Sequence, residues 1–259
     1  MSNGRRFVGT SWKMNKTARE AADYTRRLRE LLEGIERTDL VQIFIVPPFT
    51  AIEAVKRASD GRFWVGAQNM HWAEYGAYTG EISAIMLEEL GVELVELGHA
   101  ERRRYFHETD ADVGRKVQAA LRHRIRPLVC VGEQAEEKRR GNGLAIVREQ
   151  VRAAFAGVPA DGVARLMVAY EPVWAIGADN ADIRMDYVRD IQNHIRATLG
   201  ELLGTAGAQV PVLYGGDVNL RNAAPLLRES GTDGLFIGRA ALDPDNFAAL
   251  IRAALQAIA

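Results

Sequence analysis

The sequence predicts an α/β protein that folds as a single-domain (β/α)₈ barrel, and three observations support this fold. Eight short apolar runs, each about as long as a strand, recur along the 259 residues. The runs are nearly continuous in apolar residues rather than alternating, which is typical of parallel strands buried on both faces. Segments with helical spacing separate them, and eight such units in about 250 residues is the count of this barrel.

The expected strands are rich in Val, Ile or Phe, as strands buried in a parallel sheet usually are. They are RFVGTSW from residue 6, VQIFIV from 41, FWVGAQ from 63, VELVELG from 92, RPLVCVG from 126, RLMVAYE from 165, VPVLYGG from 210 and GLFIGRA from 234. Because each is followed by a helical or loop segment before the next, we expect repeated βα units.

Four of the intervening segments have a clear helical pattern. In residues 18–35 the expected apolar stripe consists of Ala22, Leu28, Leu31, Leu32 and Ile35. Residues 108–123 begin with Thr109 as an N-cap and end with basic side chains, which a helix dipole favours. Residues 185–203 and 245–258 have similar spacing.

The whole chain, residues 1–259, is expected to form one domain. No Pro/Ser-rich linker or low-complexity tract interrupts it. An open doubly wound sheet is the main alternative fold, but it would more often show fewer βα units or a second domain.

Composition argues against several classes of partner. The formal net charge of −1 gives no basic field for nucleic acid. No stretch approaches the roughly 20 apolar residues of a membrane helix, and the first residues lack the long apolar region of a signal peptide. Cys130 is the only cysteine, so an intrachain disulfide is impossible and a cytoplasmic, reducing location is expected. Its place in an apolar run indicates a buried small side chain rather than a nucleophile.

Three chemically suited side chains follow three of the expected strands. In a (β/α)₈ barrel the chemistry lies at the carboxyl ends of the strands, where Lys13 follows the first, His99 the fourth and Glu171 the sixth. Taken alone, Glu171 suits a surface ion pair, His99 a helix cap and Lys13 a surface lysine. Together they suit proton transfer beside a carbonyl, with a carboxylate base, a polarising imidazole and an ammonium that balances enediolate charge.

Glycine-rich backbone follows the last two strands, as Gly215-Gly216 and Gly238-Arg239. Exposed N–H groups in such loops are suited to binding phosphate. GNGLAI, from residue 141, lacks the third glycine and the preceding strand of a dinucleotide loop. The histidines show no metal-ligand pairing such as HExxH, so we expect no metal and no cofactor.

Seven motifs resemble the triosephosphate isomerase family, in order and across essentially the whole chain. They are SWKMN, AQNMHWAEYGAYTGEIS, ELGHAERR, VCVGE, AYEPVWAIG, YGGDVN and DGLFIG. The resemblance implies a TIM barrel and a sugar-phosphate isomerase that works with a glutamate base, a neutral histidine and a closing loop. By this resemblance Glu171 is the base, His99 the electrophile and Lys13 the electrostatic partner.

The same resemblance implies further site residues. Gly177 belongs to the lid that grips phosphate, and Glu101 supports the lysine. The glycine-rich phosphate loops contain Gly215, Gly216 and Gly238. In the lid, Pro172 limits backbone freedom next to the base, so that closure would carry Glu171 over the substrate and expel water.

Several positions depart from the family pattern. Ser11 replaces the usual Asn, Ala100 a Ser, Asp217 a phosphate-binding Ser and Arg239 a Gly, while residues 178–182 replace the second hinge of the lid. Asp217 would repel phosphate unless it turns away or pairs with a cation, for which Arg239 is a candidate that could also contact phosphate. This many changes around one pocket predict an altered substrate.

GTSWKMNKT, NMHWAEYGAYTGEIS and FIGRAA resemble the erythritol-catabolism branch of the family, whose members interconvert L-erythrulose 1-phosphate and D-erythrulose 4-phosphate. That reaction is our leading hypothesis, and we hypothesise that Ser11, which is smaller than Asn, makes room for the fourth carbon. Ordinary triosephosphate isomerase activity is the alternative. A phosphate-binding barrel without catalysis is a second alternative, kept open by Asp217 and the altered hinge.

The loop over residues 69–80 resembles the interdigitating dimer loop of the family, which implies a homodimer. Its aromatic side chains His71, Trp72, Tyr75 and Tyr78 would suit a neighbouring subunit. A loop that packs on its own barrel is the alternative.

Overall fold

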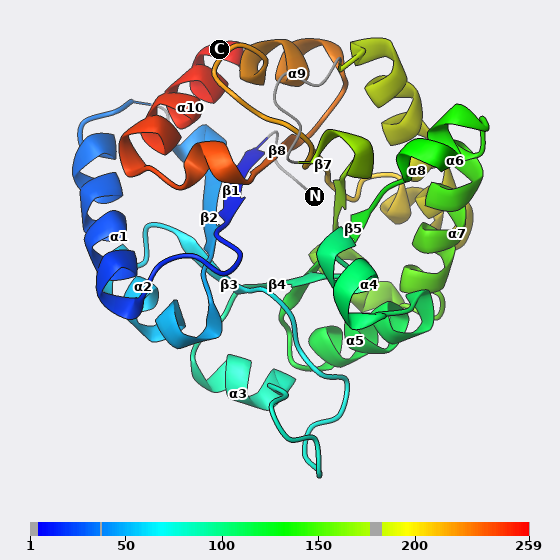
Figure 1. The fold of residues 1–259 in the computed structure, drawn as a ribbon, viewed down its shortest axis with the longest axis horizontal. Helices are drawn as coiled ribbons and strands as arrows, with labels where there is room; N and C mark the ends of the chain where they lie inside the picture. The colour runs from blue at the N-terminus through cyan, green and yellow to red at the C-terminus, as the bar shows by residue number, and fades with distance from the viewer. Residues whose placement is uncertain (1–4, 37, 177–182, 259) are drawn as a thin grey trace.

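Eight parallel strands close into a barrel in the order of the chain (Figure 1). The computed structural model describes residues 5–36, 38–176 and 183–258. The strands are β1 (Arg6–Ser11), β2 (Val41–Val46), β3 (Trp64–Ala67), β4 (Leu94–Leu97), β5 (Arg126–Val131), β6 (Met167–Tyr170), β7 (Val212–Tyr214) and β8 (Gly234–Ile237). β1 closes the barrel, because Thr10 lies opposite Ile45 of β2 and Ile237 of β8. Every predicted strand is present, so the predicted barrel is confirmed.

Helices form a ring around the strands (Figure 1). They are α1 (Ala18–Leu32), α2 (Ile52–Ser59), α3 (Ala84–Glu89), α4 (Ala100–Phe106), α5 (Asp110–Arg122), α6 (Ala135–Arg139), α7 (Gly143–Phe155), α8 (Met185–Gly207), α9 (Ala223–Glu229) and α10 (Pro244–Ala257). Thr109 caps α5 as predicted, through a capping box with Asp112. Among the helices of the described ranges, none combines the length and apolarity needed to cross a membrane.

Four of the five residues of the predicted apolar stripe of α1 face the core. Leu28 and Leu32 are buried, and Leu31 and Ile35, which lies beyond the end of α1, pack half-buried against the core. Ala22 is half-buried, and Ala21, Tyr24 and Thr25 complete the buried face. Tyr24 packs edge-on against Trp12 with ring centroids 4.7 Å apart and donates its hydroxyl to the Ala241 carbonyl, so a tyrosine with a buried acceptor belongs to a face for which the sequence predicted only aliphatic residues.

Side chains fill the interior of the barrel. Phe44 of β2 stacks on Phe236 of β8 with ring centroids 5.6 Å apart, and Gly9 of β1 leaves the space for it, because a Cβ there would lie 2.1 Å from the Phe44 ring. Cys130 of β5 is buried in the same interior cluster, as expected for a small apolar side chain. Since the interior is a packed core, a ligand can enter only at an end of the barrel.

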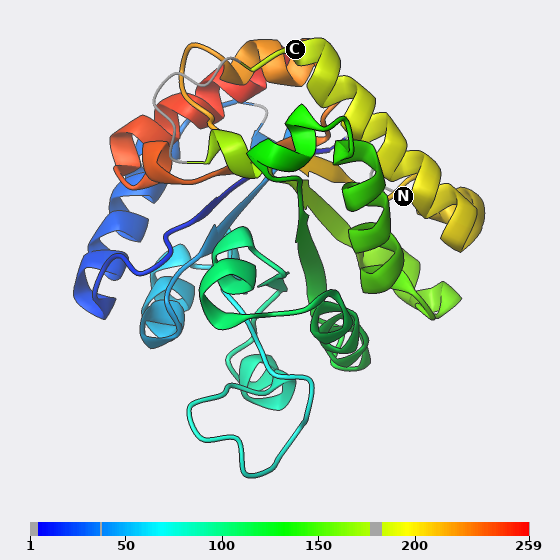
Figure 2. The same cartoon turned by 45° about the vertical axis from the view of Figure 1, so that its right-hand side comes forward.

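The chain between β3 and α3 projects away from the barrel, as Figures 1 and 2 both show. The base of this loop is tied to the body, because the His71 N–H donates to the Ile82 carbonyl and Met70 is fully buried. Further out, Tyr75 is 75% exposed. The loop thus has a fixed base and an aromatic tip in solvent.

Candidate active site

A cavity of about 450 Å³ opens at the carboxyl ends of the strands. Its lining includes these predicted site residues: Ser11, Lys13, His99, Glu101, Glu171, Gly215, Gly216, Asp217, Gly238 and Arg239. They come from the ends of β1, β4, β6, β7 and β8. Gly177 and the altered hinge at residues 178–182 lie outside the described residues. The structure therefore brings all the other predicted residues to one cavity.

Lys13 is held at the cavity by the chain around it. Trp12 is fully buried, and the next residue, Lys13, adopts a left-handed backbone with φ of 53°. Such a conformation costs a non-glycine residue about 1–2 kcal/mol; the Gln68 side-chain amide, which donates to the Lys13 carbonyl, helps to hold it. The Lys13 ammonium lies 2.8 Å from Glu101 Oε1. The contact fits the supporting role that the resemblance implies for Glu101.

His99 is both the cap of α4 and a cavity residue. Its Nδ1 accepts a hydrogen bond from the Glu101 N–H at 3.1 Å, which satisfies a free donor at the start of the helix. A nitrogen that accepts carries no proton, so the neutral ring is protonated at Nε2. Burial, reinforced by the Lys13 ammonium, lowers the pKa of His99 to about 4. His99 can therefore both cap the helix and present a neutral ring to the cavity, and the cap fixes which nitrogen of that ring carries the proton.

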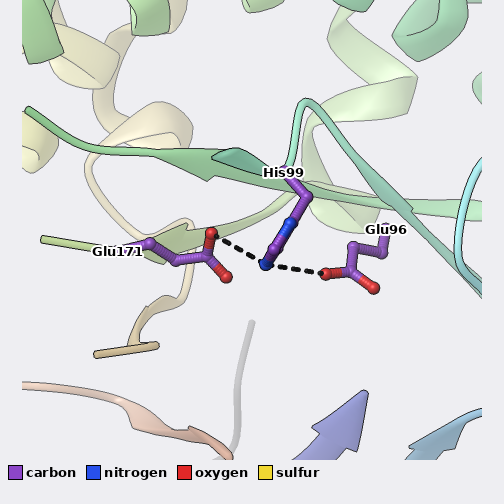
Figure 3. Close-up of side chains that lie close together, drawn as sticks. All are labelled: Glu96, His99 and Glu171. Atoms are coloured by element: carbon purple, nitrogen blue, oxygen red, sulfur yellow. Dashed lines mark ion pairs between the residues drawn. The ribbon is translucent and has the colours of Figure 1, made fainter. Parts of the chain in front are cut away.

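Glu171 lies directly after β6 and is 3% exposed. Its N–H donates to the Val131 carbonyl, which anchors the backbone. Its Oε2 lies 3.6 Å from His99 Nε2 (Figure 3) and has no hydrogen-bond partner within the described part of the chain. Burial, reinforced by the nearby Glu96 carboxylate, raises the pKa of Glu171 to about 8. A carboxylate deprived of solvation in this way is a stronger base than one in water.

Glu96 of β4 is a cavity residue that the sequence analysis missed. It is 2% exposed, and its Oε2 accepts a hydrogen bond from Ser11 Oγ at 2.7 Å. Its Oε1 lies 4.0 Å from His99 Nε2, on the side of the ring away from Glu171 (Figure 3). Burial raises the pKa of Glu96 to about 7, and the Ser11 hydrogen bond partly offsets this. The sequence did contain a sign of this residue, because an acid stands inside an apolar run. It also lies two residues after Leu94, so on a strand both side chains point into the barrel.

Glu96, His99 and Glu171 have ligand atoms within 4.8 Å of one another, a spacing that could suit a metal ion. A metal on His99 Nε2 would require the ring proton to move to Nδ1, where it would meet the N–H of Glu101. The helix cap therefore opposes metal binding. That no metal is needed stays a prediction.

The glycines after β7 are required by close packing. A Cβ at Gly215 would lie 2.9 Å from Glu171 Cγ, and one at Gly216 would lie 2.3 Å from the Tyr214 hydroxyl. At Gly238, after β8, a Cβ would meet open space, so its backbone is accessible to a ligand. These loops can therefore present N–H groups to an anion at this side of the cavity.

Asp217 is engaged by a neutral donor. Its Oδ2 accepts from Asn219 Nδ2 at 3.1 Å, and its carbonyl accepts from Asn222 Nδ2 at 2.9 Å. The Asn219 amide thus holds the Asp217 carboxylate, and the Asn222 amide holds the backbone of the turn after β7. Asp217 and Arg239 both line the cavity, and Asn219 is the partner that the sequence analysis did not foresee.

Glu133, after β5, anchors the segment that follows Glu171. Its Oε1 accepts from three donors, the Trp174 indole N–H at 2.8 Å and the hydroxyls of Tyr187 and Tyr170 at 3.0 and 3.1 Å. Its carbonyl accepts from the Val173 N–H. This buried acid holds the first residues of the predicted lid against the barrel, a role the sequence did not reveal.

The model for the triosephosphate isomerase family matches residues 6–254. The chain belongs to this family. L-Erythrulose-1-phosphate isomerase of Mesorhizobium japonicum is 48% identical over 97% of this chain and 98% of the relative. The protein of that name from Rhizobium etli is 46% identical over 93% of this chain and 89% of the relative, and that from Rhizobium meliloti is 43% identical over all of both.

The crystal structure of triosephosphate isomerase from Bartonella henselae has the same fold, with a TM-score of 0.86. It is 32% identical and covers 96% of this chain and 98% of its own. Together, these comparisons confirm the predicted resemblance. They also confirm that this triosephosphate isomerase family member is an enzyme of the sugar-phosphate isomerase class.

The raised pKa values of the two buried carboxyls predict how activity depends on pH. Glu171 must be ionised to act as a base, so kcat/KM should rise with pH through an apparent pKa between about 7 and 8, far above the usual 4.5. The two acids interact, and the apparent value belongs to the pair. The measurement is kcat/KM from pH 5 to 9.

The substrate phosphate itself titrates near pH 6. The measured kcat/KM must therefore be corrected for the fraction of ionised substrate, which ³¹P NMR gives at each pH. A corrected kcat/KM that stays level down to pH 5 would show that no carboxyl with a raised pKa limits the reaction.

Proposed function

We propose that this chain interconverts L-erythrulose 1-phosphate and D-erythrulose 4-phosphate. One observation carries the proposal: Lys13, His99 and Glu171 line a single cavity in a chain whose relatives of that name are 43–48% identical over nearly its whole length.

The reaction moves a carbonyl by one carbon. With carbons numbered from the phosphate end, C2 holds the carbonyl and C3 a hydroxyl in the first sugar phosphate, and the two are exchanged in the second. Glu171 removes the proton on C3, the electron pair forms an enediolate over C2 and C3, and Glu171 returns a proton to C2. A proton also leaves the C3 oxygen and one is gained by the C2 oxygen, so the atoms and electrons balance without a co-reactant.

His99 and Lys13 stabilise the charge that develops on oxygen. The protonated Nε2 of neutral His99 donates to the carbonyl oxygen and moves protons between the two oxygens. The Lys13 ammonium balances the enediolate charge, and Glu101 positions it through the contact of 2.8 Å. Both groups face the same cavity as the base, which supports these roles.

The phosphate is proposed to bind where β7 and β8 end. The accessible backbone of Gly238, the tight turn at Gly215 and Gly216, and the guanidinium of Arg239 supply donors there. The amide of Asn219 holds the Asp217 carboxylate, which limits its repulsion of phosphate. Gly177 is proposed to complete the grip as part of the lid.

Triosephosphate isomerase activity is the alternative, favoured by the likeness to the Bartonella henselae enzyme. A barrel that binds phosphate without catalysis is a further alternative. The shared cavity of Lys13, His99 and Glu171 argues against it, because a passive phosphate binder needs neither a carboxylate base nor an imidazole beside its ligand.

We further propose the cytoplasm as the compartment. Cys130 is the only cysteine, and it is buried with a raised pKa, so the protein gains nothing from an oxidising environment.

Parallel steady-state assays test the substrate. We expect kcat/KM with L-erythrulose 1-phosphate to exceed that with D-glyceraldehyde 3-phosphate, because the pocket departs from the family pattern at several positions. Both assays use the same enzyme preparation, so the fraction of active protein cancels. A higher kcat/KM for the three-carbon substrate would contradict the assignment.

Glu171→Gln tests the base. The amide has the same shape but cannot take a proton, so kcat should fall by about 10²–10⁴. Glu53→Gln, at an exposed site on α2, is the matched control and should retain parental kcat. A loss of less than tenfold in Glu171→Gln, with an unchanged melting temperature, would argue against the role.

We also propose a homodimer through the loop over residues 69–80. His71 stacks on Trp72 with ring centroids 4.2 Å apart and lies 4.1 Å from the Tyr78 ring, so the loop presents ordered aromatic rings behind the exposed Tyr75. Light scattering at micromolar protein should give about twice the chain mass of 28.6 kDa. Tyr75→Ala should weaken the dimer, and a parental mass equal to one chain would refute it.

A further inference from the structure

We propose that Glu96, oriented by Ser11, accepts a hydrogen bond from the terminal hydroxyl of a four-carbon sugar phosphate and so selects it over a three-carbon one. The inference rests on the proposed function, since it assigns a residue to the part of the substrate that distinguishes the two reactions. Glu96 would be a specificity-determining residue, and Ser11 the residue that positions it.

The position of Glu96 follows from the order of the strands. The proposed phosphate site lies at the ends of β7 and β8, and in the closed ring β4 is four strands from β8 in either direction. A substrate held by its phosphate therefore extends across the cavity toward β4. Its reacting carbons lie near Glu171 and His99, and the end remote from phosphate reaches Glu96, which lines the same cavity.

Glu96 has an oxygen available for a ligand. Its Oε2 is engaged by the Ser11 hydroxyl at 2.7 Å. Near Oε1 lie Cys130 Sγ at 3.9 Å, which is a weak donor, and His99 Nε2 at 4.0 Å, which is beyond hydrogen-bond distance. A carboxylate accepts several hydrogen bonds, so a buried one with a single strong donor is under-satisfied. A substrate hydroxyl would supply the missing donor.

The charges of Glu96 and Glu171 restrict what can bind at this end of the cavity. Glu96 and Glu171 lie on either side of the His99 ring (Figure 3), so a second anionic group at this end would be repelled. A neutral hydroxyl is the group that fits. The four-carbon sugar phosphate carries one on the carbon beyond C3, whereas a three-carbon substrate ends at the reacting carbon and leaves Glu96 without that donor.

The structure gives Ser11 a role different from the one that the sequence favoured. The sequence alone favoured a role in making space, but its hydroxyl donates directly to Glu96. A hydroxyl has one proton, and the hydrogen bond directs it to Glu96 Oε2, while Oε1 keeps only the weak Cys130 donor. The serine at this position is thus explained by its contact with the acid as much as by its size.

The test compares two substrates in each variant. In Glu96→Leu, which removes the acceptor from an otherwise apolar strand, the ratio of kcat/KM for L-erythrulose 1-phosphate to that for D-glyceraldehyde 3-phosphate should fall by about 10- to 100-fold. Glu96→Gln keeps a neutral acceptor and should give a smaller fall. Ser11→Ala should shift the ratio in the same direction. The ratio is independent of the amount of folded enzyme.

Glu93→Gln is the matched control for Glu96→Gln. Glu93 precedes β4 at the opposite end of the barrel, where it binds Lys56 and the Val65 N–H. Losing these contacts can lower stability, but the substrate ratio should stay at the parental value.

Two results would count against the inference. An unchanged ratio in Glu96→Leu would overturn it, and if that ratio comes from equal losses with both substrates, Glu96 belongs to the shared chemistry or to folding. If the parent enzyme itself does not turn over L-erythrulose 1-phosphate, the proposed function fails, and the inference fails with it. The parental measurement therefore separates the two failures.

Discussion

The burial of the Glu171 carboxylate is the constraint on which the rest of the site depends. The packed barrel interior below it and the segment anchored by Glu133 beside it keep water away, and Oε2 is left without a partner in the described structure. A buried acid in this state costs folding free energy, since desolvation and the nearby Glu96 both oppose its charge. The fold tolerates that cost because more than fifty apolar side chains are buried elsewhere in the molecule. The cost is also the source of reactivity, because an acid that resists ionisation holds a proton readily at neutral pH.

A single backbone hydrogen bond couples the fold to the chemistry at His99. The Glu101 N–H would remain unsatisfied at the start of α4 without an acceptor, and His99 Nδ1 provides one. The same contact places the ring proton on Nε2, between the two carboxylates, and opposes a metal there. The residue that donates this N–H also carries the carboxylate that holds Lys13. Secondary structure, tautomer and charge balance at the site are consequently set by two residues at the start of one helix, His99 and Glu101.

The sequence predicted most of the fold because buried parallel strands are visible as apolar runs, and here all eight were. It predicted Lys13, His99 and Glu171 because a barrel brings the ends of its strands to one rim, and the family resemblance gave them roles. It failed where a contact between distant residues decides the outcome. Tyr24 joins the buried face of α1 through its hydrogen bond to the Ala241 carbonyl, and Glu133 accepts hydrogen bonds from three different segments. Glu96 could not be recognised as a cavity residue from the sequence, because its hydrogen-bond partner, Ser11, comes from a different strand and only the fold brings the two together.

Three departures from the family pattern, Ser11, Asp217 and Arg239, line one cavity, and they differ in their consequences. Asp217 and Arg239 lie at the proposed phosphate end, which is chemically the same in three-carbon and four-carbon substrates, so changes there can alter how phosphate is held without altering which sugar is accepted. Ser11 lies at the other end, against Glu96, where the two substrates differ by a hydroxymethyl group. Of these three described departures, Ser11 is the one that lies where carbon number could be read, in contact with Glu96. A buried carboxylate with a single strong donor is a poor neighbour for the hydrogen that a three-carbon substrate carries in place of the hydroxymethyl group, and a good one for a hydroxyl.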